Sequence, residues 1–464
     1  MLYEVILTFM APKMPIHRLL GDSLRARVMR GSFFNLLHFG GDRGLRFLSN
    51  VILTRILFPE AFGMMVLVQT VIYALEMFSD TGVNASIIQN KRGNDPVFLN
   101  TAWTFQIIRG VLLWLLACLL AIPAAEFYGQ PMLMQLLPVA AFTTVIMGFI
   151  STKVATANKK ILMGRITALQ LGCQFIGLVV TIPLALWWQS VWALVFGSLL
   201  GRFLRVLLSH ILLPGERDRL GWDWGVFREL FDFGKFILIG SIASFFINVG
   251  DRAILGKFVS LTELAVYNIG WLLAALPMAL SRSFARRILF PLYASTSPAE
   301  SEENRRKVAK ARFAVTGSSI ALRFLMGLVG DTLVRFLYLP EYHLAGSILV
   351  LISCAVMPTI ILAAYQGQLL GAGNSRDSTI MLVTTAMVQT TLLYVGISNL
   401  GLVGVVISLS LSPLLVYPLT VYLLWRQRGW DPLHDGLFFA LALIAAGIIL
   451  WMHPEALPNV LAGV

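Results

Sequence analysis

The chain has 464 residues, of which 57% are hydrophobic and only 13% are charged, and its mean hydropathy is +0.78. A water-soluble protein of this length needs more polar surface, so the composition excludes that class and predicts an all-α polytopic membrane protein. The net charge of +12 is compatible with a nucleic-acid partner or with the inner face of a membrane protein, and its distribution along the chain separates the two.

Residues 1–30 precede the first segment that is long enough to span a bilayer. The stretch from Met1 to Met10 is apolar except for Glu4, and no small-residue cleavage site follows it. We therefore expect a cytoplasmic or interfacial N-terminal extension and not a cleaved signal peptide.

The first membrane-length helix, predicted over residues 31–58, carries Asp42, Arg43 and Arg46 in its middle. A charged group at the bilayer centre costs roughly 2.5–3.5 kcal/mol on insertion scales, so these three groups need water or a partner. Helical periodicity places them on one face, with His38 and Asn50, and apolar side chains on the other face. The pattern predicts a helix that borders a hydrated cleft.

The second predicted span ends with Glu76 and Asp80, which are four residues apart. On a helix they share a face, and two close carboxylates in a low dielectric can share a proton or a cation. This indicates coupling to H+ or Na+. Pairing with Arg43, Arg46 or Arg109 is the structural alternative.

Breaks at proline, glycine and charge clusters divide the apolar sequence into about thirteen segments of spanning length. They centre near residues 45, 75, 110, 143, 177, 202, 246, 279, 321, 357, 388, 413 and 443. We predict an N-terminal six-helix bundle over residues 31–213, a cytoplasmic linker over 214–234, and a C-terminal six-helix bundle over 235–425. One extra helix and a tail then occupy residues 435–464.

The Lys and Arg residues are distributed unequally between alternate connections. Twenty-four fall on the side of the N-terminus, and only Arg55, Lys257 and Arg335 fall on the other side. This asymmetry predicts a cytoplasmic N-terminus in a bacterial inner membrane, with anionic lipids as partners. It argues against a nucleic-acid partner.

The sequence contains a weak internal repeat. Asp42-Arg43 lies in the first span and Asp251-Arg252 in the seventh, and each pair precedes a similar turn sequence at the outer end of its span. Six spans separate the copies, so both halves have the same orientation. Parallel halves of this kind enclose a central cleft and are typical of alternating-access transporters.

The sequence Leu57-Phe58-Pro59-Glu60-Ala61-Phe62-Gly63, followed by Leu67–Thr70 and Ser79–Gly82, resembles the N-terminal signature of the oligosaccharide flippases for O-antigen and exopolysaccharide. Asn248–Lys257 resembles their seventh-helix signature. They form the polysaccharide transporter branch of the multidrug/oligosaccharidyl-lipid/polysaccharide exporter superfamily, and the resemblance covers most of the chain from about Leu24.

The resemblance implies two six-helix bundles in a V. It also implies translocation of undecaprenyl-diphosphate-linked oligosaccharide repeat units from the cytoplasmic to the periplasmic leaflet, for exopolysaccharide or lipopolysaccharide biosynthesis. A polysaccharide polymerase and glycosyltransferases are the accompanying partners. The chain departs from the fourteen-helix members, because only Met452–Val464 follow the last predicted span.

A diphosphate headgroup is bound best by guanidinium groups, whose planar forks contact phosphate oxygens in pairs. The candidates are Arg43 and Arg46 on the first helix and Arg252 on the seventh, with a second rank made up of Arg109, Lys153 and Arg323. Asp42 and Asp251 are expected to pair with these arginines in the empty site, and with Glu76 and Asp80 they form the candidate coupling groups. Static helix-to-helix pairs are the alternative interpretation, and Arg109 and Lys153 also fit snorkelling to the inner headgroups.

No catalytic, nucleotide-binding or metal-binding spacing is present in the sequence, so we expect a carrier without enzyme activity or cofactor, coupled at most to H+ or Na+. A multidrug or metabolite exporter of the same superfamily is the main alternative function. A lipid II flippase and a membrane polysaccharide polymerase or glycosyltransferase are further alternatives. The predicted outer loops are too short to hold the catalytic site of such an enzyme.

Overall fold

The computed structural model describes residues 24–160, 162–285, 289, 292–293, 301–371, 374–427 and 429–463. Most of the predicted N-terminal extension lies outside these residues, as do Lys13, Arg18, Arg286, Arg287 and Arg428 of the basic set. The first described helix begins at Leu24, within the predicted extension. It ends at Leu53, earlier than predicted.

All regular secondary structure in the described residues is helical. The first half of the chain, residues 24–213, contains α2 (Leu24–Leu53), α3 (Pro59–Met77), α4 (Val83–Gln89), α5 (Pro96–Tyr128), α6 (Leu133–Gly148), α7 (Lys153–Lys159), α8 (Met163–Trp188) and α9 (Val191–Leu212). The second half, residues 224–463, contains α10 (Trp224–Phe258), α11 (Leu261–Phe284), α13 (Glu302–Leu337), η3 (Pro340–Tyr342), α14 (Leu344–Ala355), α15 (Met357–Ala363), α16 (Gln366–Gly371), α17 (Ser375–Arg426), α18 (Pro432–Met452) and α19 (Ala456–Ala462).

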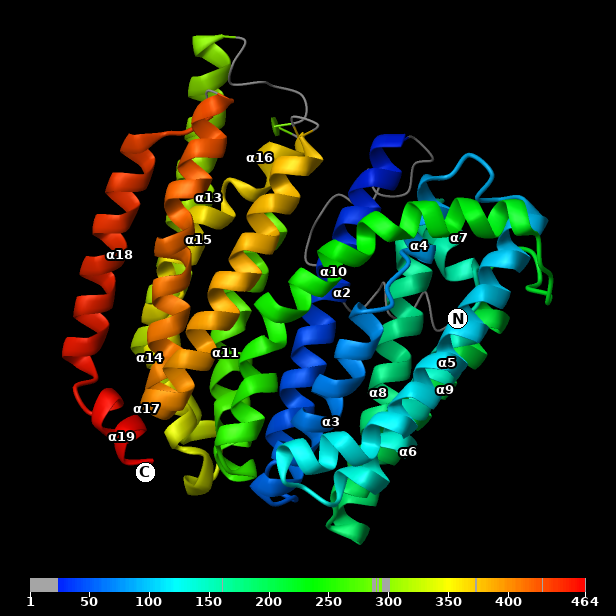
Figure 1. The fold of residues 1–464 in the computed structure, drawn as a ribbon, viewed down its shortest axis with the longest axis horizontal. Helices are drawn as coiled ribbons and strands as arrows, with labels where there is room; N and C mark the ends of the chain where they lie inside the picture. Colours follow the sequence, from blue (N-terminus) through cyan, green and yellow to red (C-terminus); the bar gives the residue numbers. More distant parts are fainter. Residues whose placement is uncertain are drawn as a thin grey trace.

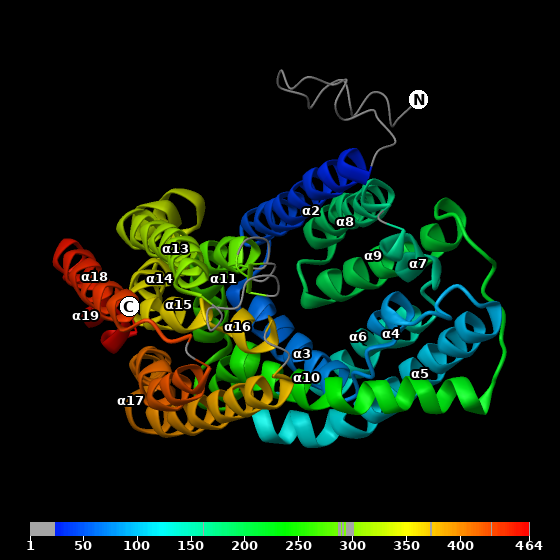
Figure 2. The same cartoon turned by 90° about the horizontal axis from the view of Figure 1, so that it is seen from above.

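The two halves lie side by side (Figures 1 and 2), with α3, α10 and α11 in the middle. The helix α10 begins above the first half and crosses toward the second. Because α10 begins at Trp224, it includes part of the predicted linker 214–234.

Side chains in the loops define where several helices begin. Asp95 accepts a hydrogen bond from Val97 N at the start of α5, and Asp223 accepts one from Val226 N at the start of α10. Ser260 and Glu263 form a reciprocal capping box at the start of α11. Each cap satisfies backbone N–H groups that have no partner within the helix.

Nine helices in the described part of the chain are long and apolar enough to cross a membrane, or eleven when two bent pairs each count as one span. The charged α2 is not among them. The helix α17 contains non-helical backbone at Gly401 (φ 57°), and Ser408 Oγ donates to Leu392 O across this kink at 2.7 Å, so its two parts fold back on each other. Every predicted segment centre lies in a helix, but the count of thirteen spans remains a prediction.

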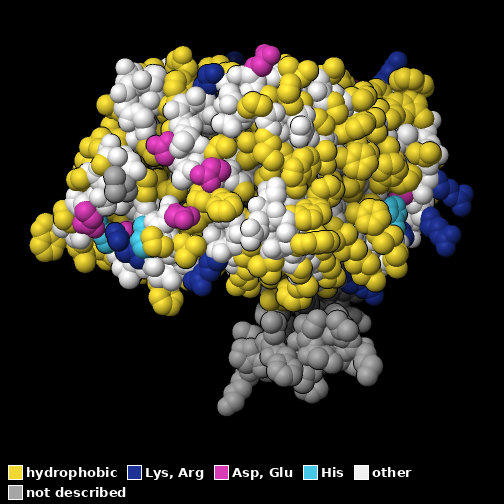
Figure 3. All heavy atoms as spheres, turned by 90° about the horizontal axis from the view of Figure 1, so that it is seen from below, with side chains coloured by type: hydrophobic (Ala, Val, Ile, Leu, Met, Phe, Trp, Pro, Cys, Tyr) yellow, Lys and Arg dark blue, Asp and Glu magenta, His cyan; other side chains and the backbone are white. Residues whose placement is uncertain are grey.

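The loops that carry most of the basic residues lie together at the upper end of the molecule in Figure 1, which we call the basic end. The starts of α4, α10, α13, α17 and α18 are found there. The helices α2, α10 and α13 end at the lower, opposite end, and Arg55, Lys257 and Arg335 lie at or just after these helix ends. Figure 3 views this opposite end, where hydrophobic side chains cover much of the surface and acidic side chains lie between them.

A continuous hydrophobic core joins the two halves near the opposite end. It includes Leu67 of α3, Leu137 of α6, Leu264 of α11 and Leu349 of α14. Toward the basic end the buried apolar residues instead form smaller, separate clusters.

Polar contacts reinforce the joined end. Thr262 Oγ1 donates to Glu60 Oε1 at 2.8 Å, Tyr338 OH donates to Asn50 Oδ1 at 2.8 Å, and an Arg55 nitrogen donates to Leu337 O at 3.1 Å. The halves are thus fastened to each other at the end opposite the basic loops.

Gly63 allows the start of α11 to approach α3 at this fastened end. A Cβ atom at position 63 would lie 2.0 Å from Leu261 O and 2.9 Å from Leu261 Cα, which are backbone atoms. We expect Gly63→Ala to lower the free energy of unfolding in detergent by about 1–3 kcal/mol, because two helices must separate.

Gly44→Ala on α2 is the matched control, since no atom lies within 4 Å of the Cβ position there. That substitution should leave stability unchanged or raise it slightly, because alanine favours helix more than glycine does. Equal unfolding midpoints for the two variants would contradict the close approach of α3 and α11.

Candidate functional site

A cluster of charged side chains lies inside the first half, where α2, α3, α5 and α9 meet. We call it the first arginine cluster, and it consists of Arg46, Arg109, Arg202 and Arg205 with Asp42, Glu76 and Asp80. Arg46 Nε contacts both carboxylate oxygens of Asp42 at 3.1 Å. The Arg46 side chain is 63% exposed. The predicted pairing of Asp42 with an arginine on the first helix is present.

Arg109 and Arg202 approach the end of α3 from two different helices. Arg109 donates to Ser79 Oγ at 3.1 Å and to Glu76 O at 2.8 Å, so it binds within the helix bundle. Arg202 lies 3.7 Å from the Glu76 carboxylate, and its side chain is 41% exposed. Arg205 Nε is buried and has no hydrogen-bond partner.

The prediction that Glu76 and Asp80 share a helix face is wrong, because α3 ends at Met77. Ser79 Oγ donates to Leu75 O at 2.8 Å and competes with continuation of the helix, and Gly82 then adopts φ 59°. Asp80 instead accepts hydrogen bonds from Gly82 N and from Ser241 Oγ of α10, both at 2.9 Å. The two carboxylates therefore have different partners.

A second group of arginines lies in the second half, around Asn248 of α10. We call Arg252, Arg282 and Arg323 the second arginine cluster. The Arg252 guanidinium lies 4.1 Å above the Trp271 ring, a cation–π contact, and donates to Asn248 O at 3.3 Å. Arg282 donates to Asn248 Oδ1 at 3.3 Å. Arg323 is fully buried and donates to Ala274 O.

Asp251 has a different partner from the one predicted. Its Oδ2 accepts a 2.6 Å hydrogen bond from Tyr267 OH, and its Oδ1 is buried without a partner. No ion pair joins it to Arg252 in the described structure. Adjacent residues on a helix point about 100° apart, which separates the carboxylate from the guanidinium.

A cavity of about 540 Å³ lies beside the second arginine cluster, within the part of the second half nearer the basic end. Its polar lining comes from Ser244, Asn248, Ser281, Arg282, Thr316 and Ser319. The remaining lining is aliphatic and includes Met278 and Ile360. Arg252 reaches this cavity only through its neighbour Asn248.

Two predicted residues stand apart from both clusters. Arg43 lies beside the Phe39 ring, at 5.8 Å from its centroid. Lys153 is buried and donates to His210 O at 2.9 Å, which braces α7 against α9.

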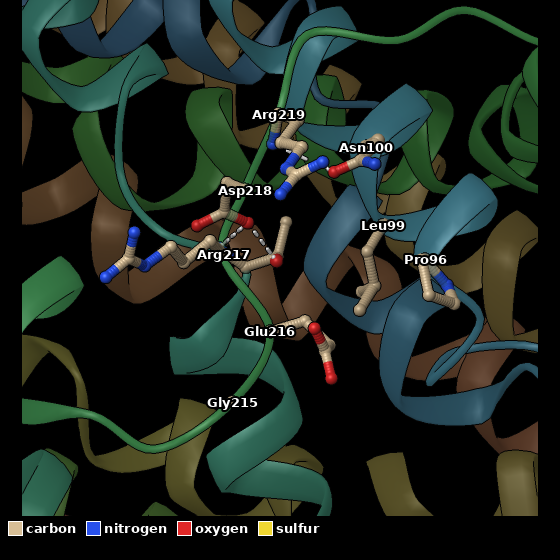
Figure 4. Close-up of a pocket in the computed structure, with 9 residues that line it drawn as sticks. Pro96, Leu99, Asn100, Gly215, Glu216, Arg217, Asp218 and Arg219 are labelled. Atoms are coloured by element: carbon tan, nitrogen blue, oxygen red, sulfur yellow. Dashed lines mark hydrogen bonds between the residues drawn. The ribbon is translucent and has the colours of Figure 1, made fainter.

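A second cavity, of about 460 Å³, lies at the basic end between the start of α5 and the loop that precedes α10 (Figure 4). Asp218 in this loop accepts hydrogen bonds from Ser151 and Thr152, and it lies 3.5 Å from His210 Nδ1. Its carboxylate is thus held by protein groups, so it positions the loop.

Sequence reasoning missed Arg202, Arg205 and Arg282 as site residues, because it assigned them to snorkelling toward the inner headgroups, although a predicted span centres near residue 202. Their number could have indicated a site, because three arginines within apolar helices are more than anchoring at the interface requires. In the first arginine cluster four guanidinium groups face three carboxylates, which leaves a positive excess. This arrangement attracts anions and suits phosphate oxygens in particular.

The sequence of residues 52–345 matches the model of a protein family described as polysaccharide biosynthesis protein. The chain is 21% identical over 277 residues to the lipopolysaccharide biosynthesis protein WzxC of Escherichia coli, covering 59% of this chain and 55% of that protein. It is also 21% identical over 268 residues to the succinoglycan biosynthesis transport protein ExoT of Rhizobium meliloti, covering 57% and 53%. The chain thus spans about half the length of these curated relatives.

Solved structures share the fold. A lipid II flippase MurJ in an inward closed conformation superposes with a TM-score of 0.70 at 11% identity, covering 93% of this chain and 96% of that one. A multidrug resistance MATE family transporter in an inward-facing conformation gives 0.60 at 15% identity, covering 83% and 95%. These likenesses confirm the predicted all-α polytopic membrane-protein fold.

The family match covers more than half of the chain, and the named relatives agree with the resemblance seen at Leu57–Gly63 and Asn248–Lys257. The chain therefore belongs to the polysaccharide biosynthesis protein family.

Proposed function

We propose that the protein is a flippase for undecaprenyl-diphosphate-linked oligosaccharide, which it moves from the cytoplasmic to the periplasmic leaflet by alternating access. The observation that carries the proposal is the first arginine cluster. The side chains of Arg46 and Arg202 are 63% and 41% exposed, and Arg202 lies in the middle of α9, which is apolar enough to cross the membrane. Exposed guanidinium groups at that depth indicate a wet site for an anion.

The carboxylates of the cluster suit an exchange of partners. Asp42 and Glu76 hold Arg46 and Arg202 in the absence of cargo. A diphosphate carries more charge than either carboxylate and offers several oxygens to each guanidinium. Cargo binding would then release Asp42 and Glu76 to water or to a proton. In the empty site the two ion pairs thus hold the guanidinium groups in place, and the diphosphate can still displace the carboxylates.

The cavity of the second half supplies groups of a different kind. Its hydroxyls, the Asn248 amide and Arg282 offer hydrogen-bond donors and acceptors, and Met278 and Ile360 offer apolar contact. Sugar rings present both hydroxyls and apolar faces, so this lining fits the oligosaccharide part of the cargo. The lipid tail would remain in the bilayer throughout, because it has no reason to leave hydrocarbon.

Fastening of the halves at the end opposite the basic loops supports a state that is accessible from the basic end. By the positive-inside rule the basic end faces the cytoplasm, so the N-terminus is cytoplasmic in a bacterial inner membrane. In this state the protein would receive cargo made by cytoplasmic glycosyltransferases, and a periplasmic polymerase would consume it after transfer.

A multidrug exporter is the second candidate, because a MATE family transporter shares the fold. The positive excess of the first arginine cluster favours an anionic cargo over the cationic compounds that an acidic pocket would select. A carrier also fits better than an enzyme, since the relatives are named for transport and biosynthesis and the clusters contain no nucleophile paired with a base.

Arg46→Ala and Arg202→Ala should each slow leaflet exchange roughly ten- to hundredfold, because a charge-assisted hydrogen bond contributes about 1.5–3 kcal/mol. Exchange is measured in proteoliposomes that contain a fluorescent undecaprenyl-diphosphate-linked disaccharide, as the fraction protected from an impermeant quencher. Arg252→Ala should slow exchange less, since Trp271 and Asn248 O already engage that guanidinium.

Arg92→Ala is the matched control, because Arg92 also pairs with a carboxylate, Asp95 at 2.9 Å, but lies in a loop at the basic end. It should exchange the probe at the wild-type rate. Loss of exchange in Arg92→Ala, or full exchange in both cluster variants, would contradict the assignment of the first arginine cluster to the diphosphate.

The orientation predicts a labelling pattern. In a variant without Cys118, Cys173 and Cys354, Lys307→Cys should react with an impermeant maleimide only in inverted membrane vesicles, because its basic-end position faces the cytoplasm. Glu455→Cys should react only in right-side-out vesicles. Both parent side chains are exposed, so reactivity reports sidedness and not burial. The reverse pattern would place the N-terminus outside.

A further inference from the structure

A buried histidine and aspartate lie side by side in the first turn of α18, remote from the first arginine cluster. His434 and Asp435 are 0% and 1% exposed. They contact residues of α13, α17 and the α15–α16 connection, so four parts of the second half meet at this pair. Buried ionisable groups in a membrane protein are costly, and they mark functional sites more often than other buried groups do.

Four donors surround Asp435. Tyr365 OH donates at 2.6 Å, Tyr417 OH at 2.8 Å and Trp430 Nε1 at 3.0 Å, and His434 Nδ1 lies 2.8 Å from Oδ1. An ionised carboxylate offers about four acceptor sites, which matches these four donors. Asp435 therefore carries a negative charge, and His434 keeps a hydrogen on Nδ1.

Nε2 is consequently the nitrogen of His434 that can gain or lose a proton. Its partner is Thr316 Oγ1 of α13, at 3.0 Å. Thr316 lines the cavity of about 540 Å³ that also contains Arg282 and Ser319. The imidazole thus reaches the cavity through a single hydroxyl.

Three charged groups lie around His434. They are Asp435 on α18, Asp431 at the N-terminal cap of α18, and Arg312 on α13. Arg312 is fully buried and stacks on the Tyr365 ring at 4.1 Å. Asp431 acts electrostatically on both Arg312 and Tyr365.

The other titratable groups that face the pair are the hydroxyls of Tyr365 and Tyr417. Tyr293 OH lies farther out and accepts a hydrogen bond from Arg312 Nε at 3.1 Å. The charged groups that face the pair are therefore one guanidinium and two carboxylates.

We propose that His434 is the binding site for a coupling proton and that Thr316 transmits its charge state to the cargo cavity; the proposal rests on the flippase function above. With Nε2 unprotonated, the Thr316 hydroxyl donates to His434. When a proton from water in the cavity binds Nε2, the imidazolium donates to Thr316 Oγ1. The Thr316 hydroxyl hydrogen is then free to turn toward an acceptor oxygen of the cargo.

Proton and cargo therefore bind with positive cooperativity, and each raises the affinity for the other. Protonated His434 is the form that favours cargo, so affinity and exchange rise as the pH falls. One linked proton gives at most a tenfold change for each pH unit. His38 of α2 interacts electrostatically with Asp42, Arg46 and Arg205 of the first arginine cluster, but it does not line the cavity of the second half.

The test measures leaflet exchange of the same fluorescent undecaprenyl-diphosphate-linked disaccharide at symmetric pH 8 and pH 6, as the ratio of the two rates. The wild-type protein should exchange at least tenfold faster at pH 6. His434→Gln should give a ratio near one, because glutamine keeps a donor and an acceptor but cannot titrate. The variant's unfolding midpoint verifies that it is folded.

His453→Gln is the matched control, since His453 lies at the other end of α18 and contacts Leu328 O at 3.0 Å. It should keep the wild-type ratio. Thr316→Val should also bring the ratio toward one while leaving Asp435 and its donors in place. A wild-type ratio in His434→Gln, or a ratio near one in His453→Gln as well, would overturn the proposal.

A second measurement needs no cargo. In nanodiscs, ¹⁵N-histidine NMR of the whole protein should show one resonance, absent in His434→Gln, whose Nε2 chemical shift differs between pH 8 and pH 6 while Nδ1 stays protonated. If the wild type exchanges no probe, the flippase function fails and this titration alone decides the proton site. A His434 resonance that does not titrate overturns the site even where exchange is present.

Discussion

A guanidinium group within the bilayer must be hydrated, paired or hydrogen bonded, and this requirement shapes both halves of the molecule. Each such charge costs roughly 2.5–3.5 kcal/mol at the centre of a membrane when it is not compensated. In the first half the compensation comes from carboxylates and partial exposure, as at Asp42–Arg46 and Glu76–Arg202. In the second half it comes from an aromatic face and backbone carbonyls, as at Arg252 and Arg323. The halves therefore share cations but differ in how easily those cations can accept an anion.

The difference gives the two halves separate roles. Carboxylate partners in partly exposed pairs can be exchanged for phosphate at little cost, because such pairs are weak. Buried contacts such as Arg312 on Tyr365 are costly to break, so they define the shape of the second half. The core near the opposite end joins both halves into one unit there. Opening of that end would have to separate Gly63 from Leu261 and Thr262 from Glu60.

Local patterns predicted part of this arrangement. The Asp42–Arg46 pair follows from a four-residue spacing on one helix, and the charge asymmetry identified the loops that share the basic end. The long-range pairs could not be predicted, because Arg202 and Glu76 meet only through packing of α9 on α3. Asp80 does not lie on the predicted helix face, because Ser79 and Gly82 end α3 before it. Asp251 accepts a hydrogen bond from Tyr267 and does not pair with an arginine. No periodic pattern in the sequence indicates that His434 and Asp435 form a site, because their four partners come from other segments.

The first turns of α10 belong by sequence to the second half, yet they pack on the first. Val226 and Leu230 are buried with Phe98 and Leu99 of α5, and the Phe227 ring meets that of Phe105 at 5.4 Å. The connection between the halves is therefore anchored rather than slack. Beyond Leu230, α10 stays in contact with the first half, through the hydrogen bond from Ser241 to Asp80 at 2.9 Å and through the Phe245 and Phe78 rings at 5.2 Å. The movement that the proposed function requires would therefore have to break these contacts or bend α10 between them.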